Sequence, residues 1–164
     1  NNSYYKKTNN EFLFLILLLF IFLQIAYGAF VSGTHAGLLF NTWPMYDGNI
    51  FPFIENNSIR GIFNFFETGE YIIFTHRTFA LIVLLFVIYI NYLFFKINKN
   101  FNNSYLLMIF NITFIIQIVL GVLMTYQNIP WYFALAHQGN SIILFLASIL
   151  MWIISKKSPQ SSLS

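Results

Sequence analysis

Four long apolar stretches constrain this sequence more than any other feature. They cover about residues 12–33, 71–95, 105–126 and 133–154, and each is long enough for a helix to cross a hydrocarbon core of ~30 Å. Because lipid offers the backbone no hydrogen-bond partners, such segments form helices or a closed barrel. The stretches are continuously apolar and lack alternation, which favours helices. The sequence therefore predicts an all-α polytopic membrane protein, a four-helix transmembrane bundle in a single domain over residues 1–164.

The composition supports a membrane environment and excludes several function classes. Hydrophobic residues make up 58% of the chain and charged residues 8%, against roughly a quarter charged in typical soluble domains. With so few charges the chain needs the lipid bilayer, or protein partners, as its solvent. It has no cysteine, so disulfides and thiolate metal sites are excluded. No basic patch suggests a nucleic-acid partner.

The lysines predict the orientation in the membrane. They precede the first stretch, separate the second from the third, and follow the fourth: Lys6, Lys7, Lys96, Lys99, Lys156 and Lys157. All therefore fall on one side, which the positive-inside tendency makes the cytoplasmic or matrix side. We expect both termini there. The outer side then holds one long connection, about residues 35–70, and one very short connection near residues 128–131.

An internal repeat divides the chain into two helical hairpins. In each copy a glutamine lies four residues before a glycine, on one helix face, and a histidine follows near the start of the next stretch. The matching residues are Gln24, Gly28 and His76 in the first copy and Gln117, Gly121 and His137 in the second. Copies that run in the same direction imply a pseudo-twofold axis along the membrane normal.

The two histidines are the leading functional candidates. His76 and His137 lie at nearly equal depth, about five residues into their stretches, and ionisable residues inside a membrane point to function. Imidazole is a common axial ligand of haem iron. We predict that the pair binds one haem, with Gly28 and Gly121 leaving space for the flat macrocycle. Arg77 is placed to pair with a propionate.

Structural alternatives remain for all of these polar residues. Membrane histidines can serve only as hydrogen-bonding packing residues, and zinc would need further ligands that do not converge here. His35, at the outer end of the first stretch, is expected to be interfacial. Close packing is the expected role of Gly33 and Gly37. Interhelical hydrogen bonds, worth ~0.6 kcal/mol on average, are expected from Gln24, Gln117, Asn111 and Asn140.

Several short motifs occur in order along the chain and point to a family. They are Gly28–Gly33, Ala36–Gly37, Phe40–Pro44 (Phe-Asn-Thr-Trp-Pro), Asp47–Gly48, Asn64–Glu67, Phe74–Arg77 and Ala134–Gln138. This ordered set resembles the haem A synthase family. The resemblance implies an eight-span protein built from two similar halves, of which this sequence looks like the C-terminal one. It also implies an oxidoreductase that converts the methyl group of haem O to the formyl group of haem A, for cytochrome c oxidase.

The resemblance further implies a division of labour between the halves. The C-terminal histidine pair, here His76 and His137, would hold a b-type haem. The N-terminal half would take the substrate haem and supply a catalytic glutamate near its first histidine. Position 73, one turn before His76, is Ile, and Glu67 and Glu70 lie further back. The catalytic residue is therefore expected in an N-terminal half, and none is assigned here.

The implied partners are that N-terminal half, in the same or a separate chain, together with haem O synthase and cytochrome oxidase assembly factors. The implied location is the bacterial plasma membrane or the mitochondrial inner membrane. A different class of function remains open: a non-enzymatic membrane haem-binding module, such as a small b-type cytochrome or a haem-transfer factor. A weaker third possibility is a structural or transport protein without haem.

Overall fold

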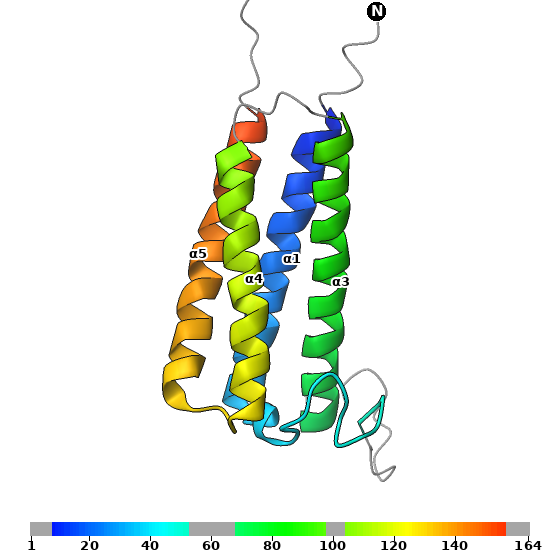
Figure 1. Cartoon of the computed structure of the whole chain (residues 1–164), viewed down its shortest axis with the longest axis vertical. Coiled ribbons are helices and arrows are strands. Elements are labelled where there is room, and N and C mark those ends of the chain that lie inside the picture. Colours follow the sequence, from blue (N-terminus) through cyan, green and yellow to red (C-terminus); the bar gives the residue numbers. More distant parts are fainter. Residues whose placement is uncertain (1–7, 53–67, 98–103, 157–164) are drawn as a thin grey trace, which may run out of the picture.

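Four long helices stand side by side in the computed structural model of the chain, which describes residues 8–52, 68–97 and 104–156 (Figure 1). The helices are α1 (Thr8–Gly33), α3 (Gly69–Ile97), α4 (Ser104–Tyr126) and α5 (Trp131–Lys156), and a short 3-10 helix, η1 (Ala36–Leu38), follows α1. Each long helix contains a segment sufficiently long and apolar to cross a membrane. The predicted all-α four-span bundle is confirmed.

The helices form two hairpins that join along α1. Helix α1 packs against α3, α4 packs against α5, and α1 also packs against α5. The start of α1, the end of α3, the start of α4 and the end of α5 share one end of the bundle (Figure 1). At the opposite end lie segment 34–52 and the short turn between α4 and α5. We call these the inner and the outer end, after the orientation that the lysines predict.

Some residues that were used to predict the family and the orientation lie outside the described residues. These are the motif Asn64–Glu67 and several charged residues of the three inner segments and the outer connection: Lys6, Lys7, Glu55, Arg60, Glu67, Lys99 and Lys157.

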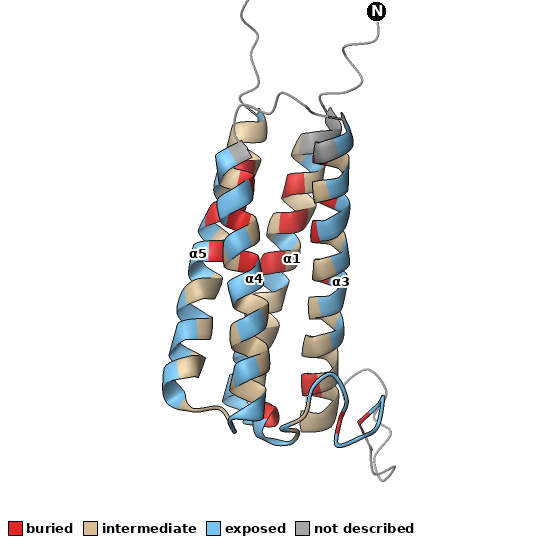
Figure 2. Ribbon diagram, viewed as in Figure 1, coloured by how far each residue is buried: buried red, intermediate tan, exposed pale blue. Residues whose placement is uncertain are grey.

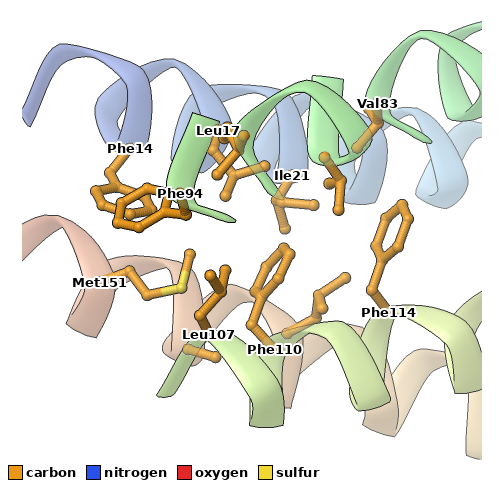
Figure 3. Packing of buried hydrophobic residues seen from close by; sticks show 13 residues of the cluster. Phe14, Leu17, Ile21, Val83, Phe94, Leu107, Phe110, Phe114 and Met151 are labelled. Carbon is orange, nitrogen blue, oxygen red and sulfur yellow. The ribbon is translucent and has the colours of Figure 1, made fainter. Parts of the chain in front are cut away.

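A large apolar core fills the inner half of the bundle. All four helices contribute to it, and their buried side chains meet around the bundle axis (Figure 3). Figure 2 shows the buried positions concentrated in this half, whereas the helices near the outer end are mostly half-buried or exposed. The buried members are Phe14, Leu17, Ile21, Val83, Val87, Ile90, Phe94, Leu107, Phe110, Phe114, Leu144, Ala147 and Met151.

The core follows the internal repeat predicted from the sequence. Counted from the matched glutamines, the buried residues of α1 take the same positions as those of α4. Counted from the matched histidines, buried residues of α3 and α5 correspond in the same way. The pairs are Phe14 with Leu107, Leu17 with Phe110, Ile21 with Phe114, Val83 with Leu144, Val87 with Ser148, and Ile90 with Met151. The two hairpins therefore present equivalent faces to one another.

One reciprocal amide pair links the two hairpins directly. The Nδ2 group of Asn91 in α3 donates to Oδ1 of Asn111 in α4 at 3.0 Å, and Asn111 Nδ2 donates back to Asn91 Oδ1 at 2.7 Å. The interhelical hydrogen bond expected for Asn111 is thereby confirmed. Asn91 also donates to the carbonyl oxygen of Val87 in its own helix. Because lipid offers no alternative partners, Asn111 depends on Asn91.

Residues 34–52, which we call the outer segment, pack closely against the outer ends of the helices. Ala36 and Tyr46 are buried together with Ile72 and Ile73 of α3. A β-carbon at Gly37 would come within 2.6 Å of Cδ1 of Ile129, so the close packing expected of this glycine is confirmed. The same expectation for Gly33 is wrong, because a β-carbon there would meet nothing within 4 Å.

Replacing Asn91 with Leu should destabilise the bundle more than replacing both members of the amide pair. The single change leaves Asn111 without its partner, at a cost of about 1–3 kcal/mol. In Asn91→Leu/Asn111→Leu neither amide is left unpaired, and an interhelical hydrogen bond is itself worth only ~0.6 kcal/mol. The free energy of unfolding in mixed detergent micelles measures both. A double variant that loses the sum of the two single losses would contradict this interpretation.

Candidate functional site

The two predicted ligand histidines lie in the outer half of the bundle, on different hairpins. His76 and His137 lie roughly two turns from the outer ends of α3 and α5. Both histidines therefore lie beyond the outer boundary of the apolar core.

Each imidazole contacts a glutamine of the neighbouring helix in its own hairpin. Gln24 Nε2 lies 3.3 Å from Nδ1 and 3.5 Å from Nε2 of His76, and it donates to the carbonyl oxygen of His76 at 3.1 Å. In the second hairpin, Gln117 Nε2 lies 3.0 Å from Nε2 of His137. The interhelical bonds expected of the glutamines are confirmed, but sequence reasoning missed that their partners are the histidines. The repeat, which pairs each glutamine with a histidine, was the available signal.

The two glycines of the repeat allow this close approach. A β-carbon at Gly28 would lie 3.3 Å from Cε1 of His76, and one at Gly121 would lie 3.2 Å from Cε1 of His137. Both distances are shorter than ordinary van der Waals contact, so the imidazoles would have to move. We expected Gly28 and Gly121 to leave space for a macrocycle. In the structure the edge of an imidazole lies against each of these glycines.

Arg77 binds the outer segment to α3, beside His76. Its Nη1 donates to the carbonyl oxygen of Thr42 at 3.0 Å and its Nη2 to that of Phe40 at 3.1 Å. The guanidinium also lies over the ring of Tyr46, 4.9 Å from the centroid. Burial raises the pKa of the Tyr46 hydroxyl, and the charge of Arg77 opposes this. The motif Phe40–Pro44 is thus held over the outer end of α3.

The other titratable candidates lie apart from the pair. His35 is exposed between α1 and η1, with a left-handed φ of 54°. Glu70 is in the first turn of α3, and position 73 is a buried Ile. Among the described residues, no group of three or more His, Cys, Asp or Glu side chains gathers where it could hold a metal ion.

The chemistry of the pair suits an iron macrocycle. A histidine that ligates a metal uses one ring nitrogen for the metal and the other for an orienting hydrogen bond. The ring of His137 has one nitrogen bound to Gln117, while Nδ1 is buried and has no hydrogen-bond partner within the described part of the chain. Imidazole is a residue type that haem iron takes as an axial ligand, and each hairpin supplies one.

Comparison with known proteins identifies the family. Residues 2–149 match the model of the cytochrome oxidase assembly protein family, COX15-CtaA. The chain belongs to this family. It is 34% identical over 157 residues to the haem A synthase of Wolbachia pipientis wMel, covering 93% of this chain and 42% of the relative. The haem A synthase of Pelagibacter ubique is also 34% identical, over 88% of this chain and 42% of its own length.

The relatives are much longer than this chain. A third one, the haem A synthase of the Wolbachia of Brugia malayi, is 36% identical over 79% of this chain and 37% of its own length. The chain therefore spans about two-fifths of the length of the curated relatives that it matches.

Gly121→Val should displace the His137 imidazole and reduce the haem retained by the purified chain severalfold. The added atoms would occupy the position of Cε1 of His137, which lies 3.2 Å from where even a β-carbon would be. Gly139→Val in α5 is the matched control, because a β-carbon there would meet nothing within 4 Å. The measurement is the haem-to-protein ratio from the visible spectrum. Equal ratios in the two variants would show that the contact at Gly121 does not matter.

Proposed function

We propose that this chain is the haem-holding half of a haem A synthase. In this proposal His76 and His137 are the axial ligands of one b-type haem. The whole enzyme, with this half included, oxidises the methyl group of haem O to the formyl group of haem A for cytochrome c oxidase. The observation that carries the proposal is the repeated Gln–Gly–His contact group, which occurs once in each hairpin. Family membership supports the assignment to haem A biosynthesis.

The surroundings of the pair support haem more than another ligand. A bis-imidazole haem takes up and releases single electrons when bound. The chain itself supplies two imidazoles, each touched by an amide and each set against a glycine backbone. Arg77, at the outer edge, can reach a propionate only by sharing donors with the carbonyl oxygens of Phe40 and Thr42. A guanidinium has five N–H donors, so both roles are compatible.

The oxidation itself is assigned to another part of the protein. A carboxylate one turn before the ligand would suit catalysis, but here that position is the buried Ile73. We therefore propose that this chain corresponds to the C-terminal half, that it relays electrons, and that the catalytic glutamate belongs to an N-terminal half in the same or a partner chain. The greater length of the relatives is consistent with such a half. Haem O synthase and cytochrome oxidase assembly factors are further proposed partners.

The proposed location is the bacterial plasma membrane or the mitochondrial inner membrane, with both termini on the cytoplasmic or matrix side. The six lysines support this orientation, since all lie before, between or after the stretches on one side. The proposed haem site then lies nearer the outer surface.

Alanine at either ligand should remove the low-spin haem signal. We expect the detergent-purified chain to show a sharp b-type band in its reduced-minus-oxidised spectrum, which His76→Ala and His137→Ala each abolish because a six-coordinate iron needs both imidazoles. His35→Ala is the control, since His35 is exposed and lies apart from the pair. An unchanged band in both ligand variants would refute the assignment.

The haem content of cells distinguishes an enzyme from a non-enzymatic haem module. Deletion of the gene should remove haem A from membrane extracts and leave haem O, and the intact gene should restore haem A. The His76→Ala gene should restore much less, because electron relay through this half would be lost. Normal haem A in the deletion strain would instead support a cytochrome or haem-transfer factor.

A further inference from the structure

The internal repeat predicts two equivalent contacts between the hairpins, and only one of them is complete among the described residues. The repeat relates α1 to α4 and α3 to α5, so the packing of α1 against α5 should have a counterpart between α3 and α4. Helix α1 does pack against α5. The rings of Phe22 and Phe145 lie 6.2 Å apart there, and Lys156 pairs with Glu11 at the inner end. In the described part of the chain, α3 and α4 do not pack along one another in this way.

The outer segment bridges α3 and α4 at the outer end of the bundle. Arg77 of α3 donates to the carbonyl oxygens of Phe40 and Thr42. From the other hairpin, the hydroxyl group of Tyr126 in α4 donates to the carbonyl oxygen of Trp43 at 2.5 Å. We call this set of hydrogen bonds the outer bridge. It joins the two helices through a third segment, without direct contact between their side chains.

Between the outer bridge and the Asn91–Asn111 pair lies a stretch of the α3–α4 side that we call the seam. Positions seven and eleven residues outward from each asparagine fall on the same helix faces as the asparagines. All four of these residues are apolar and half-buried. They are Ala80 and Leu84 on α3, and Ile118 and Val122 on α4. The seam is therefore apolar between two polar ends.

Both histidines lie at the level of the outer part of the seam. His76 precedes Ala80 by one turn of α3. On the other hairpin, the ring edge of His137 lies against Gly121, the neighbour of Val122. The guanidinium of Arg77 stands at the outer limit, so a cation lies at one end of an apolar strip that leads to the level of the histidines.

We propose that α3 and α4 part along the seam to let a haem pass between the lipid and the histidines. The inference rests on the proposed haem-binding function. Helices in a bilayer are held together largely by van der Waals packing, so the side of the bundle with the least helix-to-helix packing separates at the lowest cost. A haem has a flat apolar ring, which suits the apolar faces of the seam, and two carboxylates at one edge, which suit Arg77.

A crosslink across the seam tests this route. Because the chain has no cysteine of its own, a short bis-maleimide can join the two thiols of Ala80→Cys/Val122→Cys and no others. The measurement is the rate at which the purified haem-loaded chain, in lipid nanodiscs, transfers haem to excess apomyoglobin. Crosslinking should slow this transfer severalfold, because α3 and α4 can no longer part. The same variant without the crosslinker should transfer haem at the wild-type rate.

The repeat supplies the matched control. It places Ala29 of α1 and Ser141 of α5 in the positions equivalent to Val122 and Ala80. A crosslink in Ala29→Cys/Ser141→Cys should leave the transfer rate unchanged, since α1 and α5 already pack together. No slowing by the seam crosslink, or equal slowing by both crosslinks, would overturn the inference. A wild-type chain that binds no haem would instead overturn the proposed function, so the two failures are distinguishable.

Removing one bond of the outer bridge tests the same route without a crosslink. Tyr126→Phe loses the hydrogen bond to Trp43 and should transfer haem to apomyoglobin severalfold faster than the wild type, with an unchanged reduced-minus-oxidised spectrum. Tyr132→Phe is the control, because it removes a half-exposed tyrosine hydroxyl at the same end of the bundle, on α5. Transfer from Tyr126→Phe that is no faster than from Tyr132→Phe would contradict the inference.

Discussion

Inside a bilayer a polar side chain has no water to bind, so an amide or imidazole within the spans is stabilised when it finds a partner in another helix. This requirement organises the bundle. The reciprocal Asn91–Asn111 pair links the two hairpins near the apolar core, and the glutamines reach the histidines across each hairpin. In a membrane such bonds contribute modestly to stability. Their larger effect is on register, because a helix that slid along its neighbour would leave these groups unpaired.

The inner half of the bundle contains the apolar core, and the outer half contains the polar residues of the candidate site. Large apolar side chains of all four helices interlock in the inner half, and their repeat-related positions bring the hairpins face to face (Figures 2 and 3). The same equivalence sets both histidines at one level of the outer half. Two histidines at matched depth therefore follow from one repeated hairpin. The two hairpins depart from equivalence one turn after the histidines, where Asn140 of α5 bonds to Gln117 and the corresponding Phe79 of α3 packs against Phe20.

The outer segment links the family motifs to this site. Arg77, the residue next to a proposed ligand, donates to backbone carbonyls within the Phe-Asn-Thr-Trp-Pro motif, and Tyr46 lies under its guanidinium. A motif distant from His76 in sequence thus packs at the end of the helix that carries it. This contact gives a physical reason why loop and helix motifs occur together in the order that resembles haem A synthases.

The sequence by itself determined the four spans, the repeat and the two histidines, because these depend on span length, on the need to satisfy the backbone in lipid and on residue identity at matched positions. Only the tertiary structure decided which groups touch. Gln117 could have bonded to any neighbouring helix, and nothing local in the sequence shows that it meets His137 on one side and Asn140 on the other. The contact of Gly121 also appears only in the structure, where the edge of the His137 imidazole lies against its backbone. Such contacts depend on helix rotation and spacing, which the packing of the whole core sets.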